Sequence, residues 1–217
     1  MAKQTFETLS GAQIVVRLLE RQGVRTLAGI PGGAILPIYD ALSQSALIHH
    51  VLARHEQGGG FMAQGIARAT GAPAVCLASS GPGATNLLTA IADAKLDSIP
   101  LVAITGQVPR AMIGTDAFQE VDTYGLSIPI TKHNFLVNCA EDLLEVVPRA
   151  FRIAASGRPG PVLIDIPKDV QNQLVEVGEW PAIGVAEPVP APAAERVGVA
   201  AAMINEASRP ILYLGGG

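Results

Sequence analysis

The sequence predicts an α/β fold, in which helices cover both faces of a parallel sheet. Short, nearly continuous apolar runs alternate with longer segments of helical periodicity. Strands of a parallel sheet are buried on both faces, so they lack the polar–apolar alternation of a half-exposed strand. Segments rich in glycine or polar residues follow the first four runs, and ligands of such sheets lie beyond the carboxyl ends of the strands. The same pattern therefore predicts the fold class and the edge of the sheet at which a ligand would bind.

The composition excludes several classes of protein. Of the 217 residues, 49% are hydrophobic and 16% are charged, which supplies enough apolar material for a globular core. The net charge is −4 and the 15 lysines and arginines form no basic block, so no nucleic acid is expected as a partner. No uninterrupted apolar run reaches the roughly 18 residues of a membrane span, so no membrane partner is expected.

The cysteines and histidines predict neither a disulfide framework nor a metal site. Cys76 and Cys139 are far apart in the sequence, and each lies in or beside an apolar run, which fits a reducing, cytoplasmic location. The N-terminus has neither the apolar core of a signal peptide nor the character of a transit peptide. None of the histidines has metal-ligand spacing to a cysteine or carboxylate, so no metal ligand is assigned in this chain.

The secondary-structure elements can be assigned in chain order. A first helix is expected over 11–23, with Thr8 or Ser10 as its N-cap and Gly23 as its stop signal. Strands are expected at 26–30, 46–53, 73–78, 100–105, 129–137 and 161–167. Further helices are expected within 31–44, 54–71, 84–96 and 141–157.

The composition changes at Gly178. Residues 1–177 are expected to form one domain, and the Pro- and Ala-rich segment 178–194 reads as an extended linker. A helix over 197–210 and a strand from Ile211 into a glycine turn then resemble the opening of a βαβ unit. Residues 195–217 are therefore expected to be the truncated start of a second α/β domain.

The segment SSGPGATN (79–86) is a tight glycine turn before a helix. Such a turn presents backbone N–H groups to a polar or anionic ligand. It is no Walker motif, because no Gly-Lys-Ser/Thr follows, and Asn86 stands where a dinucleotide fingerprint requires its third glycine. A plain strand-to-helix turn remains an alternative.

The segment RHEQGGGFMAQG (54–65) combines helical spacing with a glycine run. Each glycine within a helix costs roughly 0.5–1 kcal/mol relative to alanine, so close approach of another group is expected to offset that cost. The approaching group could be a ligand, a neighbouring helix or another subunit. Glu56 at the start of this helix either complements the helix dipole or exchanges a proton with a ligand nitrogen.

Other polar segments lie at the strand ends. Pro31-Gly32-Gly33 could place bare backbone against a ligand ring, or could be a simple turn. The segment 105–122 is long for a loop inside a domain, and loops of that length often carry function. Arg158 and Lys168 lie on either side of the strand 161–167, and both could also be ordinary solvated side chains.

Several motifs together resemble a known family over residues from about 10 to 217: the catalytic large subunit of acetolactate synthase, also called acetohydroxyacid synthase. These enzymes depend on thiamin diphosphate and act in branched-chain amino acid synthesis. The motifs are GIPGGAILPIYDAL, ARHEQG, SSGPGATN, ITGQVP, MIGTDAFQE, ITKHN and SGRPGPVLIDIPKDV.

The resemblance implies roles for individual residues. Glu56 matches the catalytic glutamate that hydrogen-bonds N1′ of the aminopyrimidine, and Gln119 matches a glutamine facing the reacting centre. Arg158 matches an arginine that contacts FAD, and Gly215 and Gly216 match the start of the FAD-binding glycine turn. The other thiamin-binding positions are Ile30, Pro31, Gly32, Ser79, Pro82, Gly83 and Asn86. Residues resembling the substrate channel are Gly33, Ala34, Pro109, Ala117, Phe118 and Lys168.

The resemblance also implies an activity, cofactors and partners. Residues 1–177 would be the pyrimidine-binding domain, and 195–217 would begin the central FAD-binding domain. The enzyme would decarboxylate pyruvate and condense the product with a second pyruvate or 2-oxobutyrate. Its partners would be another copy of itself, bound through the pyrimidine-binding domain as a homodimer or higher oligomer, and a regulatory small subunit.

The family's diphosphate-binding domain with its Mg²⁺ ligands does not match any part of this chain. The chain alone is therefore expected to be inactive and to belong to a longer enzyme. Two alternatives stay open at this point: a related thiamin-diphosphate decarboxylase or carboligase for another 2-oxo acid, and a non-catalytic assembly module.

Overall fold

A computed structural model describes residues 6–213, and its core is a six-stranded sheet. The strand order is β3-β2-β4-β5-β7-β6, and every neighbouring pair is parallel. This confirms the predicted class of a parallel sheet flanked by helices. The strands are β2 (Thr26–Gly29), β3 (His49–Leu52), β4 (Ala74–Ala78), β5 (Leu101–Gln107), β6 (His133–Leu136) and β7 (Pro161–Pro167).

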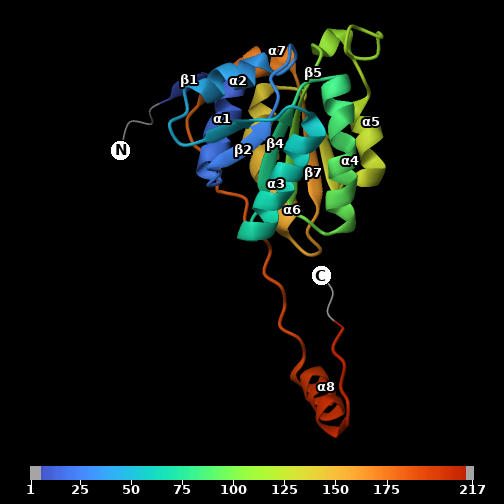
Figure 1. The fold of residues 1–217 in the computed structure, drawn as a ribbon. Helices are drawn as coiled ribbons and strands as arrows, with labels where there is room; N and C mark the ends of the chain where they lie inside the picture. Colours follow the sequence, from blue (N-terminus) through green and yellow to red (C-terminus); the bar gives the residue numbers. More distant parts are fainter. Residues whose placement is uncertain (1–5, 214–217) are drawn as a thin grey trace, which may run out of the picture.

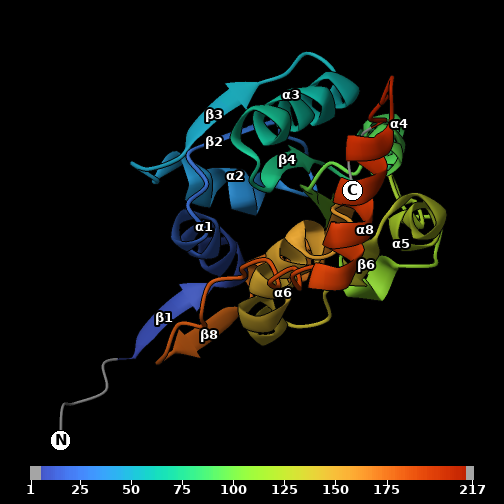
Figure 2. The ribbon, with the colours of Figure 1, turned by 90° about the horizontal axis from the view of Figure 1, so that it is seen from below.

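Helices cover both faces of the sheet (Figures 1 and 2). One face carries α1 (Gly11–Arg21), α2 (Leu36–Ser43) and α6 (Leu143–Ala155), and the other carries α3 (Glu56–Thr70), α4 (Pro82–Leu96) and α5 (Thr123–Ser127). The short α7 (Lys168–Asn172) follows β7. Three 3₁₀ turns complete the body at Arg110–Met112, Ile128–Ile130 and Ala140–Asp142.

The two faces of the sheet differ in side-chain size. On β4, Val75 and Leu77 join the core under α1, α2 and α6, whereas Ala74, Cys76 and Ala78 face α3 and α4. Small side chains let a helix approach the sheet closely, so α3 can carry glycine on its inner face. The helix α3 thus lies nearer to its neighbours than bulkier residues would permit.

The glycines of α3 serve two different surroundings. A Cβ on Gly60 would lie 2.6 Å from the Cβ of Ala90 in α4, and a Cβ on Gly59 would lie 3.7 Å from the Cα of Gly29 in β2. Gly58 and Gly65 have open space where a Cβ would stand. Packing between helices therefore explains why residue 60 is glycine. No contact within the described residues explains the glycines at 58 and 65.

Helix ends follow the sequence signals closely. Ser10 is the N-cap of α1: its Oγ accepts from the N–H of Gln13 at 3.2 Å, and the Gln13 Oε1 accepts from the N–H of Ser10 at 2.8 Å. This reciprocal capping box decides between the two predicted caps. Gly71, with φ +70°, ends α3 in the left-handed conformation that glycine adopts most readily.

Several predictions from the sequence are wrong. A second, two-stranded sheet pairs β1 (Glu7–Ser10) with β8 (Leu174–Val177) in antiparallel register, and neither strand was expected (Figure 2). The expected strand at 129–137 covers only β6, because 128–130 form a 3₁₀ turn. The last helix, α8 (Ala194–Glu206), begins three residues earlier than expected, and residues 211–213 form no strand. Gly215 and Gly216 lie outside the described residues.

The predicted linker has no regular structure between β8 and α8, but its first part is packed rather than free. The Arg21 guanidinium stacks 5.8 Å from the Trp180 ring centroid and donates to the carbonyl of Pro181 at 3.1 Å. A Cβ on Gly184 would collide with the carbonyl of Pro148 in α6. Beyond this stretch α8 stands apart from the body, and none of its described residues is buried (Figure 1).

The loop 108–121, which lies between β5 and the N-cap of α5, is held together by a carboxylate. Glu120 accepts hydrogen bonds from the backbone N–H groups of Gly114, Thr115 and Ala117, the last at 2.9 Å. These bonds, led by that from Gly114, hold the pKa of Glu120 below its ordinary value. Asp122 then N-caps α5 by accepting from the N–H of Gly125 at 2.8 Å.

Gly60→Ala is expected to destabilise the protein by about 1–3 kcal/mol, because the new methyl group would overpack the contact with Ala90. Gly65→Ala, on the open face of the same helix, is the matched control. It should raise the free energy of unfolding by roughly 0.5–1 kcal/mol through helix propensity. Urea unfolding of both variants checks this, and equal effects of the two substitutions would contradict the packing argument.

The order of the loop should depend on pH through Glu120. Because the folded-state pKa is lowered, the stabilisation is complete above the ordinary value of 4.5 and is lost as the pH falls through the lower folded-state value. Amide resonances of Gly114, Thr115 and Ala117, followed by NMR as the pH is lowered below 4.5, should shift together. Glu120→Gln should abolish that titration. Resonances that titrate unchanged in the variant would assign the effect to another group.

Candidate active site

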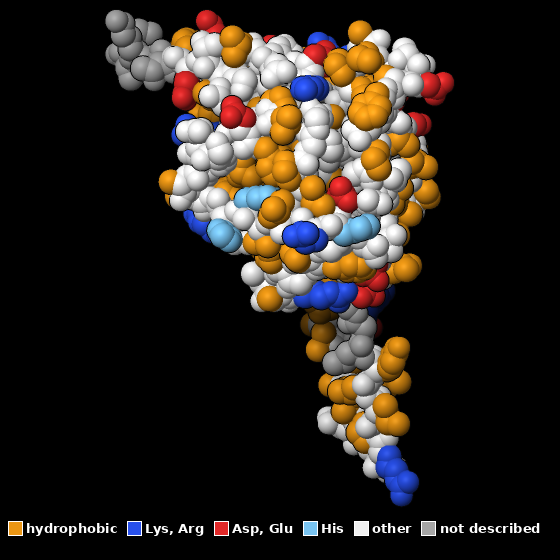
Figure 3. Space-filling model, turned by 45° about the horizontal axis from the view of Figure 1, so that its top comes forward, with side chains coloured by type: hydrophobic (Ala, Val, Ile, Leu, Met, Phe, Trp, Pro, Cys, Tyr) orange, Lys and Arg blue, Asp and Glu red, His pale blue; other side chains and the backbone are white. Residues whose placement is uncertain are grey.

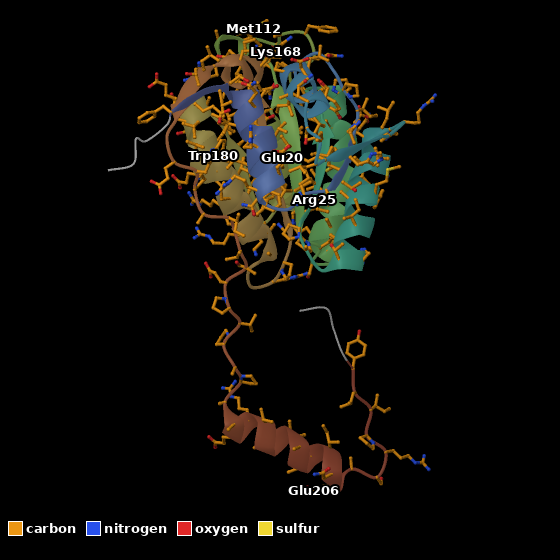
Figure 4. The ribbon with its side chains drawn as sticks, turned by 90° about the vertical axis from the view of Figure 1, so that its left-hand side faces the viewer. Glu20, Arg25, Met112, Lys168, Trp180 and Glu206 are labelled. Carbon is orange, nitrogen blue, oxygen red and sulfur yellow. The ribbon has the colours of Figure 1, made fainter. Side chains whose placement is uncertain are left out.

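The carboxyl ends of the strands meet at one edge of the sheet. Gly29 of β2 pairs with Leu77 of β4, and Ala78 pairs with Thr105 of β5, so the segments after these strands leave the sheet side by side. Met112 and Lys168, labelled at the top of Figure 4, mark this edge. Turned toward the viewer in Figure 3, the edge shows hydrophobic side chains with charged groups scattered singly between them.

Glu56 lies at this edge as the first residue of α3. The helix begins there because His55 is its N-cap, with Nδ1 accepting from the N–H of Gln57 at 3.2 Å. Asn86 of α4 donates from Nδ2 to the Glu56 Oε2 at 2.9 Å. Among the described residues no donor bonds to Oε1, so one oxygen of a half-buried, oriented carboxylate is left to accept a hydrogen bond from a ligand.

Glycine backbone lies beside this carboxylate. A Cβ on Gly83 would lie 3.5 Å from the Glu56 Oε1 and 3.3 Å from the Cβ of Ser79, so any larger side chain there would fill the space before the carboxylate. A Cβ on Gly32 would lie 2.5 Å from the Ser79 Cβ. The loop 30–32 is thereby brought against the turn 79–83, and the two form a cradle to which Gly32 and Gly83 contribute backbone without a side chain.

The long loop after β5 reaches the same cradle. Gly81 has φ +54°, and a Cβ on it would lie 2.6 Å from the carbonyl oxygen of Gln119. Gln119 itself has φ +57°, a conformation that costs free energy in a non-glycine residue. The structure therefore brings the backbone of Gln119 to the turn that follows β4.

The residues predicted as a substrate channel all follow β2, β5 or β7 at this edge. Ala34 is buried, and its carbonyl accepts from the Gln171 Nε2 at 2.7 Å. Phe118 is 87% exposed, so its ring has almost no packing partner among residues 6–213. Lys168 is the first residue of α7 and is half-buried. Gly33 and Pro109 lie in the loops after β2 and β5, and Ala117 is bound to Glu120.

Tyr39 and His50 lie behind the cradle, and neither residue was predicted to belong to the site. Their rings meet edge to face at a centroid distance of 5.0 Å, and both the Tyr39 hydroxyl and the His50 Nε2 are buried without a hydrogen-bond partner. Burial, with smaller contributions from Cys76 and Glu56, raises the pKa of Tyr39. The one signal in the sequence was that Tyr39 lies within the motif GIPGGAILPIYDAL, which follows β2.

Arg158 lies at the opposite, amino-terminal edge, just before β7. Its guanidinium donates to the Ser98 Oγ at 2.8 Å and to the Leu96 carbonyl at 3.1 Å. With Lys95, Lys132 and Glu187 it lines a hollow of about 390 Å³. The structure thus places Arg158 and Glu56 at opposite edges of the sheet.

The cradle fits one end of a flat, nitrogen-containing ring. The carboxylate offers an acceptor for a ring nitrogen, and the glycine backbone allows a ring to approach closely. Among residues 6–213 no group of three His, Cys, Asp or Glu side chains could hold a metal ion. None of the helices in that part of the chain combines the length and hydropathy needed to cross a bilayer.

The chain is similar to known proteins over nearly all its length. Residues 9–126 match the family described as "Thiamine pyrophosphate enzyme, N-terminal TPP binding domain". The chain is 65% identical over 213 residues to "Acetolactate synthase isozyme 1 large subunit" of Escherichia coli, covering 98% of this chain and 38% of that protein. It is 56% identical over 209 residues to isozyme 2 of the same organism, with 96% and 38% covered.

A third relative is "Acetolactate synthase" of Mycobacterium bovis, 55% identical over 216 residues that cover 98% of this chain and 35% of the relative. The chain therefore spans little more than a third of the length of the relatives it matches. The family match covers more than half of the 217 residues. The chain belongs to the thiamine pyrophosphate enzyme family and contains its N-terminal TPP-binding domain.

Proposed function

We propose that this chain is the pyrimidine-binding part of an acetolactate synthase large subunit. The complete enzyme would decarboxylate pyruvate and join the remaining two-carbon unit to a second pyruvate or to 2-oxobutyrate, in the synthesis of valine, leucine and isoleucine. The observation that carries the proposal is the oriented Glu56 carboxylate, with one free oxygen facing side-chain-free backbone. The names of the three relatives support the choice of reaction.

Thiamin diphosphate, when bound, would supply an acidic ring C–H whose deprotonated carbon can add to the carbonyl of a 2-oxo acid, and a positively charged ring that can accept the electrons left when CO₂ departs. Glu56 would hydrogen-bond N1′ of the aminopyrimidine through Oε1 and hold a proton there. Asn86 fixes the other oxygen and so sets the direction of that bond. Ile30, Pro31, Gly32, Ser79, Pro82 and Gly83 would line the ring.

The loop after β5 would form the wall nearest the substrate. Gln119 would face the reacting centre, since its backbone lies against Gly81. Ala117, Phe118, Pro109, Gly33, Ala34 and Lys168 would line the approach of the 2-oxo acid. The exposed Phe118 ring supports this assignment, because burial by a ligand or another subunit would stabilise it.

The remaining ligands would bind elsewhere. FAD would contact Arg158 at the opposite edge, and residues 195–217, including Gly215 and Gly216, would begin the FAD-binding domain beyond the linker 178–194. Residues 1–177 would form the pyrimidine-binding domain. Mg²⁺ would be held with the diphosphate by residues that are not among those described. The protein would be cytoplasmic.

Two kinds of protein partner are proposed. A second copy would bind to the outer face of α3 and the neighbouring β3, where Leu52, Phe61 and Met62 are 61%, 40% and 46% exposed beside the open space at Gly58 and Gly65. Such an interface would give a homodimer or higher oligomer. A regulatory small subunit is proposed because the relatives from Escherichia coli are named large subunits.

Glu56→Gln in the complete enzyme should lower kcat at least about 100-fold, since the amide cannot exchange a proton as the carboxyl group does. The amide oxygen can still accept from Asn86, so the free energy of unfolding should change by no more than about 0.5 kcal/mol. Glu145→Gln, on the exposed side of α6, is the control and should leave kcat unchanged. Near-normal acetolactate formation by the Glu56 variant would refute the role given to Glu56.

The chain of 217 residues, mixed with thiamin diphosphate, Mg²⁺ and pyruvate, should yield no acetolactate, because its described residues include no metal-binding cluster to hold a diphosphate. The complete enzyme under the same conditions is the positive control. Product analysis with pyruvate, 2-oxobutyrate and glyoxylate distinguishes this reaction from that of a related decarboxylase or carboligase. Clear product from the chain alone would overturn the proposal that its site is incomplete.

A further inference from the structure

A buried carboxamide lies at the base of the loop 108–121. Gln107, the last residue of β5, is 3% exposed, and its three hydrogen bonds satisfy both ends of its amide group. Its Oε1 accepts from the N–H of Val108 at 2.9 Å, at the beginning of the loop. Its Nε2 donates to the carbonyl of Val121 at 2.9 Å, at the end of the loop.

Asp165 fixes which way this amide points. The Asp165 Oδ2 accepts from the Gln107 Nε2 at 3.0 Å, and its Oδ1 accepts from the Thr105 Oγ1 at 2.7 Å. Asp165 is 1% exposed and pairs with Thr105 across β5 and β7, so neither partner can turn toward water. Because the Gln107 Oε1 is bound by the N–H of Val108, the nitrogen end of the amide is the one that faces Asp165.

Burying the Asp165 carboxyl group costs free energy, and an apolar side chain could fill the same space without that cost. Burial raises the pKa of Asp165 to about 7, although the hydrogen bonds from Thr105 and Gln107 act in the opposite direction. A buried acid of this kind persists when its hydrogen bonds specify an arrangement that an apolar residue could not. Here the arrangement is the closure of the loop that carries Gln119.

We propose that Asp165 and Gln107 are positioning residues: the Gln107 amide, oriented by Asp165, clamps the two ends of the loop 108–121 and so holds Gln119 against Gly81. The clamp acts on the loop's base, while Glu120 orders its tip. Gln119 has a positive φ and lies against Gly81, and fixing both ends of the loop favours this arrangement by restricting the alternatives. The relevance of the clamp to catalysis rests on the function proposed above, but its existence does not.

A second buried glutamine provides the matched control. Gln171 is fully buried, and its Nε2 donates to the carbonyls of Ala34 at 2.7 Å and Ile166 at 2.8 Å. It therefore holds a different loop at the same edge. Substituting either glutamine by methionine removes a buried amide of the same size. The Gln171 Oε1 has no hydrogen-bond partner among the described residues, so the comparison depends on where protection is lost and not on equal destabilisation.

Hydrogen exchange of the 217-residue chain tests the clamp. In Gln107→Met the amides of Gly114, Thr115 and Ala117 should exchange about tenfold faster, the effect of losing about one hydrogen bond from the closed loop. In Gln171→Met these amides should be unchanged relative to those of β5 and β7. Asp165→Asn keeps an oxygen that can accept from Gln107 and should retain most of the protection. Equal protection in Gln107→Met and the native chain, or equal loss in the two methionine variants, would overturn the proposal.

Kinetics of the complete enzyme separate the clamp from the proposed reaction. Gln107→Met should lower kcat for acetolactate formation about tenfold or more, as a slightly misplaced group does. It should leave the Kd for thiamin diphosphate unchanged, because Glu56 and Asn86 are untouched. Faster exchange with unchanged kcat would confirm the clamp and refute the loop's part in the reaction, whereas loss of activity in Glu56→Gln tests the proposed function independently.

Discussion

The contact of α3 with α4 is the constraint on which the candidate site depends. Because Gly60 meets Ala90 without an intervening side chain, the first turn of α3 lies within hydrogen-bonding distance of Asn86 on α4. Bulkier residues at the interface would separate the helices and break the bond that orients Glu56. The small residues of β4 under α3 serve the same end, since they lower the helix onto the sheet. The same small residues therefore determine both how α3 packs and how the Glu56 carboxylate is oriented.

The loops of the site depend on a different kind of interaction. The strands are aligned by backbone hydrogen bonds between neighbours, but the loops that follow them have no such regular bonds to hold their conformation. Buried side chains hold these loops instead: Gln107 bonds to the loop after β5, and Gln171 bonds to the loop after β2. Each amide binds backbone groups that would otherwise be buried without partners. The site is thus a rigid sheet edge to which irregular segments are attached by a few specific polar contacts.

The sequence predicted what repeats locally and missed what depends on distant partners. Apolar runs and glycine turns located the six parallel strands, and Ser10 with Gln13 carried a recognisable capping box. The pairing of β1 with β8 could not be predicted, because both strands are short and more than 160 residues separate partners such as Glu7 and Val177. Glu56 was identified by position and by family motif. Gln107 was not, since nothing in the segment TGQVP indicates that its amide faces Asp165.

The packing of the linker on α6 has a consequence for whatever lies beyond it. The N–H of Glu187 donates to the Ser156 Oγ at 2.9 Å, so the chain is attached to the body as far as this residue. The free tether to α8 is therefore residues 188–193 rather than the whole of 178–194. Six residues span at most about 20 Å when fully extended. Because Glu187 also lines the hollow beside Arg158, the first residue of α8 lies within that reach of the hollow.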